Sequence, residues 1–117
     1  MADELVYAAV SRGMDRSEAL ERAATGFESL GLAPSVLFER RCWGLSGGEK
    51  RLVQVIGALI APAGLLCLDE PTAGLDSLKR AALGGLVSRR GEAGPVLVAS
   101  QDAGWISAWA TRSIVLK

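Results

Sequence analysis

The chain has 117 residues, of which 50% are hydrophobic, and its 13 basic residues balance 13 acidic ones. A chain of this length and composition forms one domain with a hydrophobic core rather than a disordered segment. The balanced charge and the lack of a basic cluster argue against nucleic acid or an anionic membrane surface as a partner.

Histidine is absent, and the two cysteines, Cys42 and Cys67, lack the spacing of metal ligands, so no zinc site is expected. A reduced, cytoplasmic setting fits this cysteine content. The opening residues MADELVYAAV carry no basic stretch before an apolar one, so they do not indicate a secretory signal. The uncharged stretch Leu52–Leu68 is shorter than the ~20 residues of a membrane span, and Pro62 interrupts it.

The first half of the chain has the apolar spacing of helices. Gly13 and Gly31 end two of these patterns, and Asp15 or Ser17 can cap the second helix. An irregular link is predicted between the second helix and the third. The helices are expected over residues 3–12, 15–30 and 47–61, with the link over residues 32–44.

The second half alternates strands and helices. The runs "LLCLD" and "PVLVAS" are continuously apolar, as expected for strands covered on both faces in a parallel sheet, so Cys67 is expected to be buried and inert. "SIVLK" predicts a third strand at the end, and Trp105 and Trp109, four residues apart, predict a packing stripe. The intervening helices are expected over residues 78–90, where "RRGEAGP" breaks the pattern, and 103–110. The order of elements predicts an α/β chain with a helical part, residues 1–61, and a sheet part, residues 62–117.

The segment "LSGGE" places two glycines after a serine at the start of a helix. Backbone N–H groups there have no intrahelical partner, and the helix dipole favours negative charge, so the turn can hold a phosphate. The alternative is structural. Ser46 then acts as a plain N-cap, and Glu49 completes a capping box with it.

The segment "LLCLDEP" ends a strand on two carboxylates, Asp69 and Glu70. The carboxyl edge of the sheet is where open α/β folds bind their ligands. One carboxylate can hold Mg²⁺ through water, and the other can orient or deprotonate an attacking water. The alternative is an acidic turn before Pro71.

The stretch Leu45–Asp76 closely resembles the second half of the nucleotide-binding domain of ABC-type ATPases. "LSGGE" is similar to the signature motif of that family, "LLCLDEP" to its Walker B strand with the adjoining glutamate, and "AGLD" to its D-loop. Residues 2–32 resemble the matching segment of the ATPase subunits of energy-coupling-factor importers. The resemblance implies a partial P-loop NTPase fold, in which the helical (signature) subdomain precedes a three-stranded, mostly parallel remnant of the core sheet.

The resemblance also implies a role for each matching residue. The signature would contact the γ-phosphate of an ATP held by a second domain. Asp69 would support Mg²⁺ through water, and Glu70 would be the general base. Gln101 stands where the family has its switch histidine; it can donate a hydrogen bond to phosphate but cannot carry charge. The nucleotide-binding residues implied are Leu45, Ser46, Gly47, Gly48, Glu49 and Asp76.

The phosphate-binding motif GxxxxGK[ST] does not occur in the chain, nor does a counterpart of the Q-loop glutamine. We therefore expect an ATP-binding and ATP-hydrolysing subunit present as a fragment, with ATP and Mg²⁺ bound only in a completed site. The expected partners are a second nucleotide-binding domain, a chain that supplies the P-loop, and the membrane subunits of a transporter. Nucleic acid is not expected, and the location is the cytoplasmic face of the membrane.

Two alternatives stay open. One is the C-terminal ATPase half of an SMC-type chromosome or repair protein, where signature and Walker B are also separated from the P-loop; against it, "DEPTAGLD" resembles the transporter form and no heptad repeat leads into the signature. The other is a non-enzymatic regulator that donates a signature face to a partner ATPase.

Overall fold

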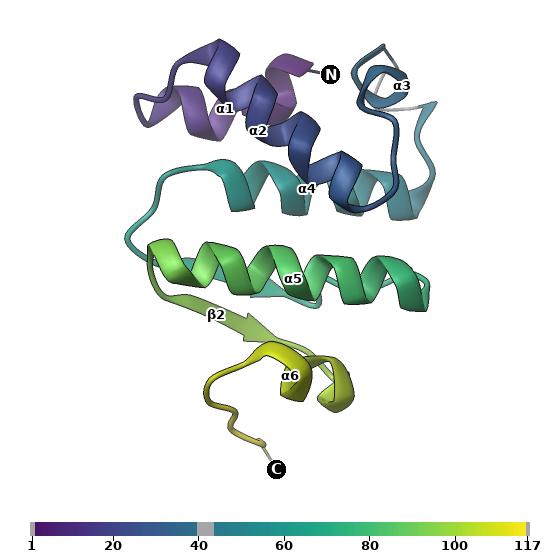
Figure 1. Ribbon diagram of the computed structural model, residues 1–117, viewed down its shortest axis with the longest axis vertical. Helices are drawn as coiled ribbons and strands as arrows, with labels where there is room; N and C mark the ends of the chain where they lie inside the picture. The colour runs from purple at the N-terminus through teal and green to yellow at the C-terminus, as the bar shows by residue number, and fades with distance from the viewer. Residues whose placement is uncertain (1, 40–43, 117) are drawn as a thin grey trace.

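The computed structural model describes residues 2–39 and 44–116, without the side chains of residues 36–38, so that Cys42 and Lys117 lie outside the described residues. Figure 1 shows the first helices gathered at one end of an elongated molecule of 41 × 29 × 22 Å, with α5, β2 and α6 following toward the other end. The elements are α1 (Ala2–Ser11), α2 (Arg16–Ser29), α3 (Pro34–Glu39), α4 (Gly47–Ile60), β1 (Leu66–Asp69), α5 (Ser77–Ala93), β2 (Val96–Ala99) and α6 (Ala103–Trp109).

The ends of the first two helices follow local signals in the sequence. Asp15 is the N-cap of α2, and its carboxylate accepts hydrogen bonds from the backbone N–H groups of Ser17 at 3.0 Å and Glu18 at 3.4 Å. Gly13 and Gly31 follow α1 and α2 with φ angles of 93° and 73°, which favour glycine. These ends confirm the two predicted helices.

Two expectations about the other helices are wrong. Residues 34–39 form α3 instead of an irregular link, because Pro34 occupies the first helical position, where its fixed φ suits the helix and its missing N–H has no role. α5 runs through the predicted break to Ala93 and ends at Gly94. An isolated glycine such as Gly91 costs a helix interior only ~1 kcal/mol, which packing of the same helix offsets.

The uncharged stretch Leu52–Leu68 divides into a helix and a strand, as predicted. α4 ends at Ile60, just before Pro62, and β1 begins at Leu66. Among the described helices, none combines the length and the apolar composition needed to cross a membrane.

Figure 1 shows α1, α2 and α4 packed together at one end of the molecule, and the main hydrophobic core lies between them. Phe27 of α2 and Ile56 of α4 are almost completely buried, and Leu5 of α1 packs in the same cluster. The apolar stripe of each helix therefore faces the other two, as amphipathic helices require.

Gly57 sets the distance between α1 and α4. A β-carbon on this residue would lie 2.9 Å from the backbone oxygen of Leu5. Replacing Gly57 by Ala should lower the free energy of unfolding by about 1–3 kcal/mol, because the two backbones must move apart. The matched control is Gly91→Ala in α5, where a β-carbon meets nothing within 4 Å. The control should raise stability by roughly 0.5–1 kcal/mol in urea unfolding, and equal effects of one sign would contradict the close approach.

β1 and β2 form a two-stranded parallel sheet, with α5 as the connection between them. Leu66 lies opposite Val96, and Asp69 lies opposite Ala99. The buried side chains of Leu66 and Leu68 point toward α4 and α5. The two runs predicted as strands are thus confirmed as parallel neighbours.

The opposite face of this sheet is open in the described part of the chain. Cys67 and Leu97 lie opposite each other on that face, and Leu97 is 63% exposed. The expectation of strands covered on both faces, and of a buried Cys67, is therefore wrong here, because the helices that the structure describes pack on one face of the sheet.

The predicted third strand is absent from the described residues. The segment 113–116 has no regular structure, and Ile114 and Leu116 are 81% and 91% exposed. A strand gains its stability from pairing with a neighbour, and neither β1 nor β2 pairs with this segment. Its β-branched, apolar composition alone does not suffice to form a strand.

Candidate nucleotide site

The signature turn starts α4. Ser46 is the N-cap, with extended backbone, and its hydroxyl oxygen accepts a hydrogen bond from the backbone N–H of Glu49 at 3.1 Å. The predicted cap is thus present. The described residues supply no acceptor for the N–H groups of Gly47 and Gly48, and a β-carbon on Gly47 would meet nothing within 4 Å. The turn therefore combines a cap with two backbone donors that an anion can reach.

The carboxyl end of β1 brings Glu70 to Gln101. The half-buried Glu70 donates its backbone N–H to the oxygen of Ala99 at 2.8 Å, and its carboxylate accepts the backbone N–H of Gln101 at 3.0 Å. These two site residues are 31 positions apart in the sequence and meet because parallel strands end at the same edge. The contact uses the backbone of Gln101, while its exposed side chain stays available.

Glu70 has a φ of 45°, and it is the non-glycine residue with a positive φ among those the structure describes. The left-handed region costs a non-glycine residue on the order of 1–3 kcal/mol, and such strain is concentrated at functional sites. The two hydrogen bonds at its backbone and carboxylate hold this conformation. The carboxylate is thereby aimed at the loop that follows β2.

Asp76 caps α5. Its carboxylate accepts the backbone N–H of Lys79 at 2.8 Å and pairs with the Lys79 ammonium at 3.1 Å. The backbone hydrogen bond first, and then the side-chain hydrogen bond of Lys79, hold the pKa of Asp76 below its ordinary value. In the described part of the chain, Asp76 therefore works as an ionised N-cap.

The cap at Asp76 predicts a pH dependence. Because its folded pKa is depressed, its contribution to stability is complete above the unfolded value of about 3.9 and is lost as the pH falls through the lower folded value. Asp76→Asn should therefore flatten the fall of the melting temperature between about pH 5 and about pH 2. Lys79→Met should retain most of that fall, since it keeps the backbone N–H that is the main cause. Identical acid profiles for the parent and Asp76→Asn would contradict this role.

The signature turn lies beside the loop that precedes α5. A β-carbon on Gly48 would lie 3.6 Å from the backbone oxygen of Gly74, which has a φ of 78°. Leu45 and Leu75, on either side of this contact, are both buried. The sequence analysis did not predict this contact. A β-carbon at 3.6 Å would be an ordinary van der Waals contact, so the distance does not require glycine at position 48, whereas the positive φ of Gly74 favours glycine there.

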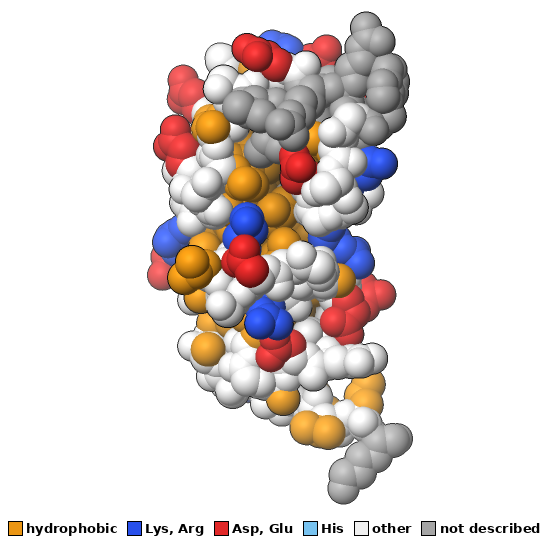
Figure 2. Space-filling view, turned by 90° about the vertical axis from the view of Figure 1, so that its right-hand side faces the viewer, with side chains coloured by type: hydrophobic (Ala, Val, Ile, Leu, Met, Phe, Trp, Pro, Cys, Tyr) orange, Lys and Arg blue, Asp and Glu red, His pale blue; other side chains and the backbone are white. Residues whose placement is uncertain are grey.

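Four elements bring their ends to one side of the molecule. In Figure 1 the N-terminal ends of α4 and α5 and the carboxyl ends of β1 and β2 lie on the same side. Ser46 and Asp76 cap those helices, while Glu70 and Gln101 follow those strands. Figure 2 views this side and shows acidic and basic side chains around hydrophobic ones. The residues predicted from the motifs therefore gather on one face.

Known proteins are similar to this chain in sequence and in fold. A family profile described as "AAA domain, putative AbiEii toxin, Type IV TA system" matches residues 8–104. A putative ABC transporter ATP-binding protein of Methanopyrus kandleri is 47% identical over 74 residues, which are 63% of this chain and 27% of the relative. An energy-coupling factor transporter ATP-binding protein of Mycoplasmopsis synoviae is 34% identical over 116 residues, 98% of this chain and 37% of the relative. The chain belongs to this AAA domain family, and it is an ABC-type ATPase domain like its relatives.

Solved structures of ABC-type ATPases superpose on the chain. The cbiO1 protein of Clostridium perfringens, described as part of the ABC transporter complex cbiONQ, matches with a TM-score of 0.60 and 26% identity over 90% of this chain and 42% of its own. An archaeal ribosome recycling factor matches with a TM-score of 0.68 and 28% identity over 90% of this chain and 19% of its own. The chain therefore spans less than half the length of these ABC-type ATPases. One of them is described as part of a transporter and the other as a ribosome recycling factor, so the fold alone does not identify the process.

The carboxylates of this ABC-type ATPase chain fit Mg²⁺ only together with a nucleotide. The described residues contain no cluster of three or more metal-binding side chains. Asp69, exposed at the end of β1, and Glu70 are adjacent carboxylates. Mg²⁺ is held in proteins by one or two carboxylates, water and substrate phosphates, so this pair suits an ion that arrives with ATP.

Hydrogen bonds and an ion pair that the sequence analysis did not predict hold the loop around Gln101 in place. Asp102 caps α6 by accepting the backbone N–H of Trp105 at 2.9 Å, and it pairs with Arg80 of α5 at 3.6 Å. The indole N–H of Trp105 donates to the backbone oxygen of Arg80 at 2.7 Å. Trp105 also stacks edge-on against Trp109, with ring centroids 5.0 Å apart, which confirms the predicted packing stripe. The loop beside Glu70 is thereby tied to α5.

Proposed function

We propose that the chain is the signature-bearing part of an ATP-hydrolysing subunit of an energy-coupling-factor-type importer. The P-loop and Q-loop, which the chain lacks, would come from polypeptide outside it. The observation that carries the proposal is the meeting of Glu70 and Gln101 at the sheet edge, on the face that also holds the Ser46 turn. The similarity to an energy-coupling factor subunit over 98% of the chain supports the transporter class.

The proposed roles follow the geometry of this face. The N–H groups of Gly47 and Gly48, which have no acceptor among the described residues, would bind the γ-phosphate of an ATP held by a second nucleotide-binding domain. Ser46 and the adjoining Leu45 and Glu49 would take part in the same contact. Their position at a helix N-terminus suits the negative charge. These residues would thus serve a site that the partner domain completes.

The strand ends would serve a different nucleotide. Glu70 would orient or deprotonate the attacking water, and Asp69 would hold Mg²⁺ through water, while the Gln101 amide would donate a hydrogen bond to the γ-phosphate. Asp76, beside the signature turn, would link the two sites. Positioning and charge stabilisation are most of what phosphoryl transfer requires, so these groups suffice once phosphate-binding residues are added.

The proposal assigns the two parts of the chain to different parts of the ATPase domain. Residues 1–61 would form the signature subdomain, and residues 62–117 would form the C-terminal part of the ATPase core. The assembled protein would work as a dimer of nucleotide-binding domains on membrane subunits, at the cytoplasmic face of the membrane. We do not propose nucleic acid as a partner.

ATP binding and turnover test the proposal. The chain alone should show an unchanged melting temperature in millimolar Mg-ATP and release no phosphate. Mixed with the part of the Mycoplasmopsis synoviae relative that it does not match, it should bind ATP and release phosphate. ATP turnover by the chain alone, or an inactive mixture in which both parts are folded and associated, would contradict the proposal.

Co-purification separates the alternatives. Membrane subunits support the transporter reading, whereas DNA and coiled-coil proteins would support the SMC-type reading. An intact ATPase as the only partner would instead support a regulator that donates its signature face.

A further inference from the structure

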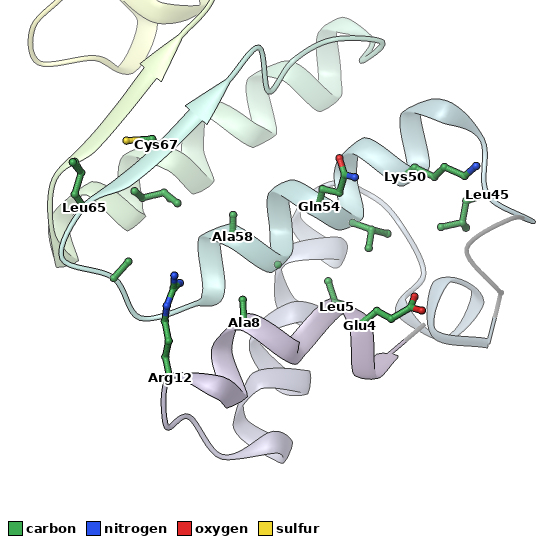
Figure 3. A pocket seen from close by; sticks show the side chains of 14 residues that line it. Glu4, Leu5, Ala8, Arg12, Leu45, Lys50, Gln54, Ala58, Leu65 and Cys67 are labelled. Carbon is green, nitrogen blue, oxygen red and sulfur yellow. The ribbon is translucent and has the colours of Figure 1, made fainter.

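The groove shown in Figure 3 lies between α1, α4 and β1 and has a volume of about 640 Å³. Its lining includes Leu45 and Lys50, on either side of the signature turn, so it borders the candidate nucleotide site and is not a separate one. A different feature, which the proposed roles leave unused, lies where α5 meets α6. There Arg80 of α5 and Asp102, the residue after Gln101, form an ion pair.

The backbone of the loop at Gln101 is held by a carboxylate on each side. The N–H of Gln101 donates a hydrogen bond to Oε1 of Glu70 at 3.0 Å. In the next residue, Asp102, Oδ1 accepts the backbone N–H of Trp105 at 2.9 Å, and Oδ2 lies 3.6 Å from Nη1 of Arg80. Because Glu70 follows β1 and Arg80 lies near the start of α5, the loop is fixed between the end of the sheet and a helix.

Arg80 holds this loop with two separate groups. Its backbone oxygen accepts the indole N–H of Trp105 at 2.7 Å, and its guanidinium faces Asp102. Trp105 is buried, and a β-carbon on Gly84, one turn farther along α5, would lie 3.1 Å from the indole nitrogen, so α6 packs closely on α5. A substitution at position 80 keeps the backbone oxygen. It therefore removes the ion pair and leaves this packing in place.

The ion pair between Arg80 and Asp102 is too exposed to contribute much to stability. The two side chains are 42% and 32% exposed, and a pair of this kind adds little to the free energy of unfolding. Its place next to Gln101 indicates another use, since a displacement of about 1 Å at a reacting group can slow a reaction roughly 10²-fold. A weak contact can therefore matter to the rate while it hardly affects the fold.

We propose that Arg80 is a positioning residue for ATP hydrolysis. Through Asp102 it holds the Gln101 amide at the sheet edge, and through the N–H of Gln101 it steadies the carboxylate of Glu70. This inference rests on the proposed function, in which Gln101 donates to the γ-phosphate and Glu70 acts on the attacking water. Arg80 acts on both groups through Asp102, so it affects their placement and not the chemistry itself.

Two substitutions remove the ion pair and keep the hydrogen bonds around it. Arg80→Met keeps a long side chain and the backbone oxygen that accepts the Trp105 indole. Asp102→Asn keeps an oxygen that can cap α6, since Asn and Asp are equally good N-caps. Arg80→Lys keeps the positive charge, and at 3.6 Å the contact depends on charge rather than on a hydrogen bond. Arg89→Met, exposed on the same helix, is the matched control.

Hydrogen exchange at the Gln101 amide reports the placement of the loop in the chain alone, without nucleotide. Arg80→Met and Asp102→Asn should each speed this exchange about three- to tenfold, because the hydrogen bond to Glu70 opens more often. The double variant should match the single ones, because both break the same contact. Arg80→Lys and Arg89→Met should exchange as the parent does. A change of charge alone would shift the two single variants in opposite directions, since a positive field attracts the hydroxide that catalyses exchange.

In the completed ATPase, loss of the ion pair should lower kcat for phosphate release about tenfold and change the KM for ATP by less than about twofold. This split follows because the pair places the reacting groups and does not bind the nucleotide. Arg80→Lys should keep kcat within about twofold of the parent, and Arg89→Met should leave it unchanged. Equal circular dichroism, with melting temperatures within about 5 °C of the parent, would exclude misfolding as the cause.

The inference is overturned if Arg80→Met exchanges and turns over ATP as the parent does, and such a result in an active mixture leaves the proposed function standing. It is also overturned if Arg80→Met raises KM with kcat unchanged, or if Arg80→Lys loses as much activity as Arg80→Met. Faster exchange at Gln101 in a mixture that never turns over ATP would contradict the proposed function and still support Arg80 as the residue that holds the loop.

Discussion

Glu70→Gln should lower phosphate release from the completed ATPase by about 10²–10⁴-fold, the usual contribution of a general base. The amide oxygen of Gln can still accept the backbone N–H of Gln101, which lies 3.0 Å from the carboxylate, so the loop geometry should survive. What the variant loses is the negative charge that accepts or orients a proton of the attacking water. ATP binding should stay close to that of the parent, because the carboxylate acts on water and not on the phosphates.

The matched control for this loss is Glu92→Gln, an exposed carboxylate near the end of α5. It should leave phosphate release unchanged. Single-turnover release of labelled phosphate, with ATP binding measured separately by filter retention, distinguishes chemistry from binding. A Glu70→Gln protein that turns over ATP as fast as the control would remove Glu70 from the role of base. Loss of ATP binding in place of turnover would assign Glu70 a structural role.

Local chemistry in the sequence predicted most of the helix ends and the motif geometry. Ser46 and Asp15 cap helices because their side-chain oxygens satisfy N–H groups that the helix leaves unpaired. The apolar runs around Leu66 and Val96 predicted parallel neighbours, and parallel strands bring their carboxyl ends to one edge. The meeting of Glu70 and Gln101 follows from that rule, and no contact between them is visible in the sequence itself.

Sequence patterns failed where the outcome depends on what lies next to a segment. The apolar run that contains Cys67 is typical of a strand covered on both faces, yet the described helices cover one face. The segment with Ile114 has strand-forming residues and no strand to pair with. The contact of Gly48 with Gly74 joins the start of α4 to the loop before α5, and such an approach has no periodicity to detect. In each case the outcome depends on which other segment packs against the residue, and the periodicity of the sequence does not predict that.

Position 101 illustrates how a single residue limits the functional inference. Its backbone N–H holds Glu70, and any residue except proline can supply that hydrogen bond. Its side chain is exposed and free to reach a phosphate, and there the difference between Gln and a titratable His matters. The structure therefore shows a geometric role for the backbone of Gln101, and the chemical role of its amide stays a prediction.

Phe27→Ala should cause the largest loss of stability, about 3–5 kcal/mol, since it removes a fully buried ring from the core between α1, α2 and α4. Gly26, its neighbour, already lies so close to Ile56 that a β-carbon would stand 2.9 Å from its methyl group. The backbone of α2 is thus already packed tightly against α4 at this point, and it cannot move closer to fill the cavity.

A loss of this size is comparable with the total stability of many domains, which is roughly 5–15 kcal/mol. Because the sheet of this chain keeps one open face, we expect its stability at the lower end, so Phe27→Ala should abolish cooperative thermal unfolding. Tyr7→Ala is the matched control, since it removes an aromatic ring that is 72% exposed and should change the free energy of unfolding by less than about 0.5 kcal/mol. Urea unfolding followed by circular dichroism and by tryptophan fluorescence compares the two variants. A cooperative Phe27→Ala protein within about 1 kcal/mol of the control would mean that α2 contributes little to the core, and that the packing of α1 on α4 alone holds the helical part together.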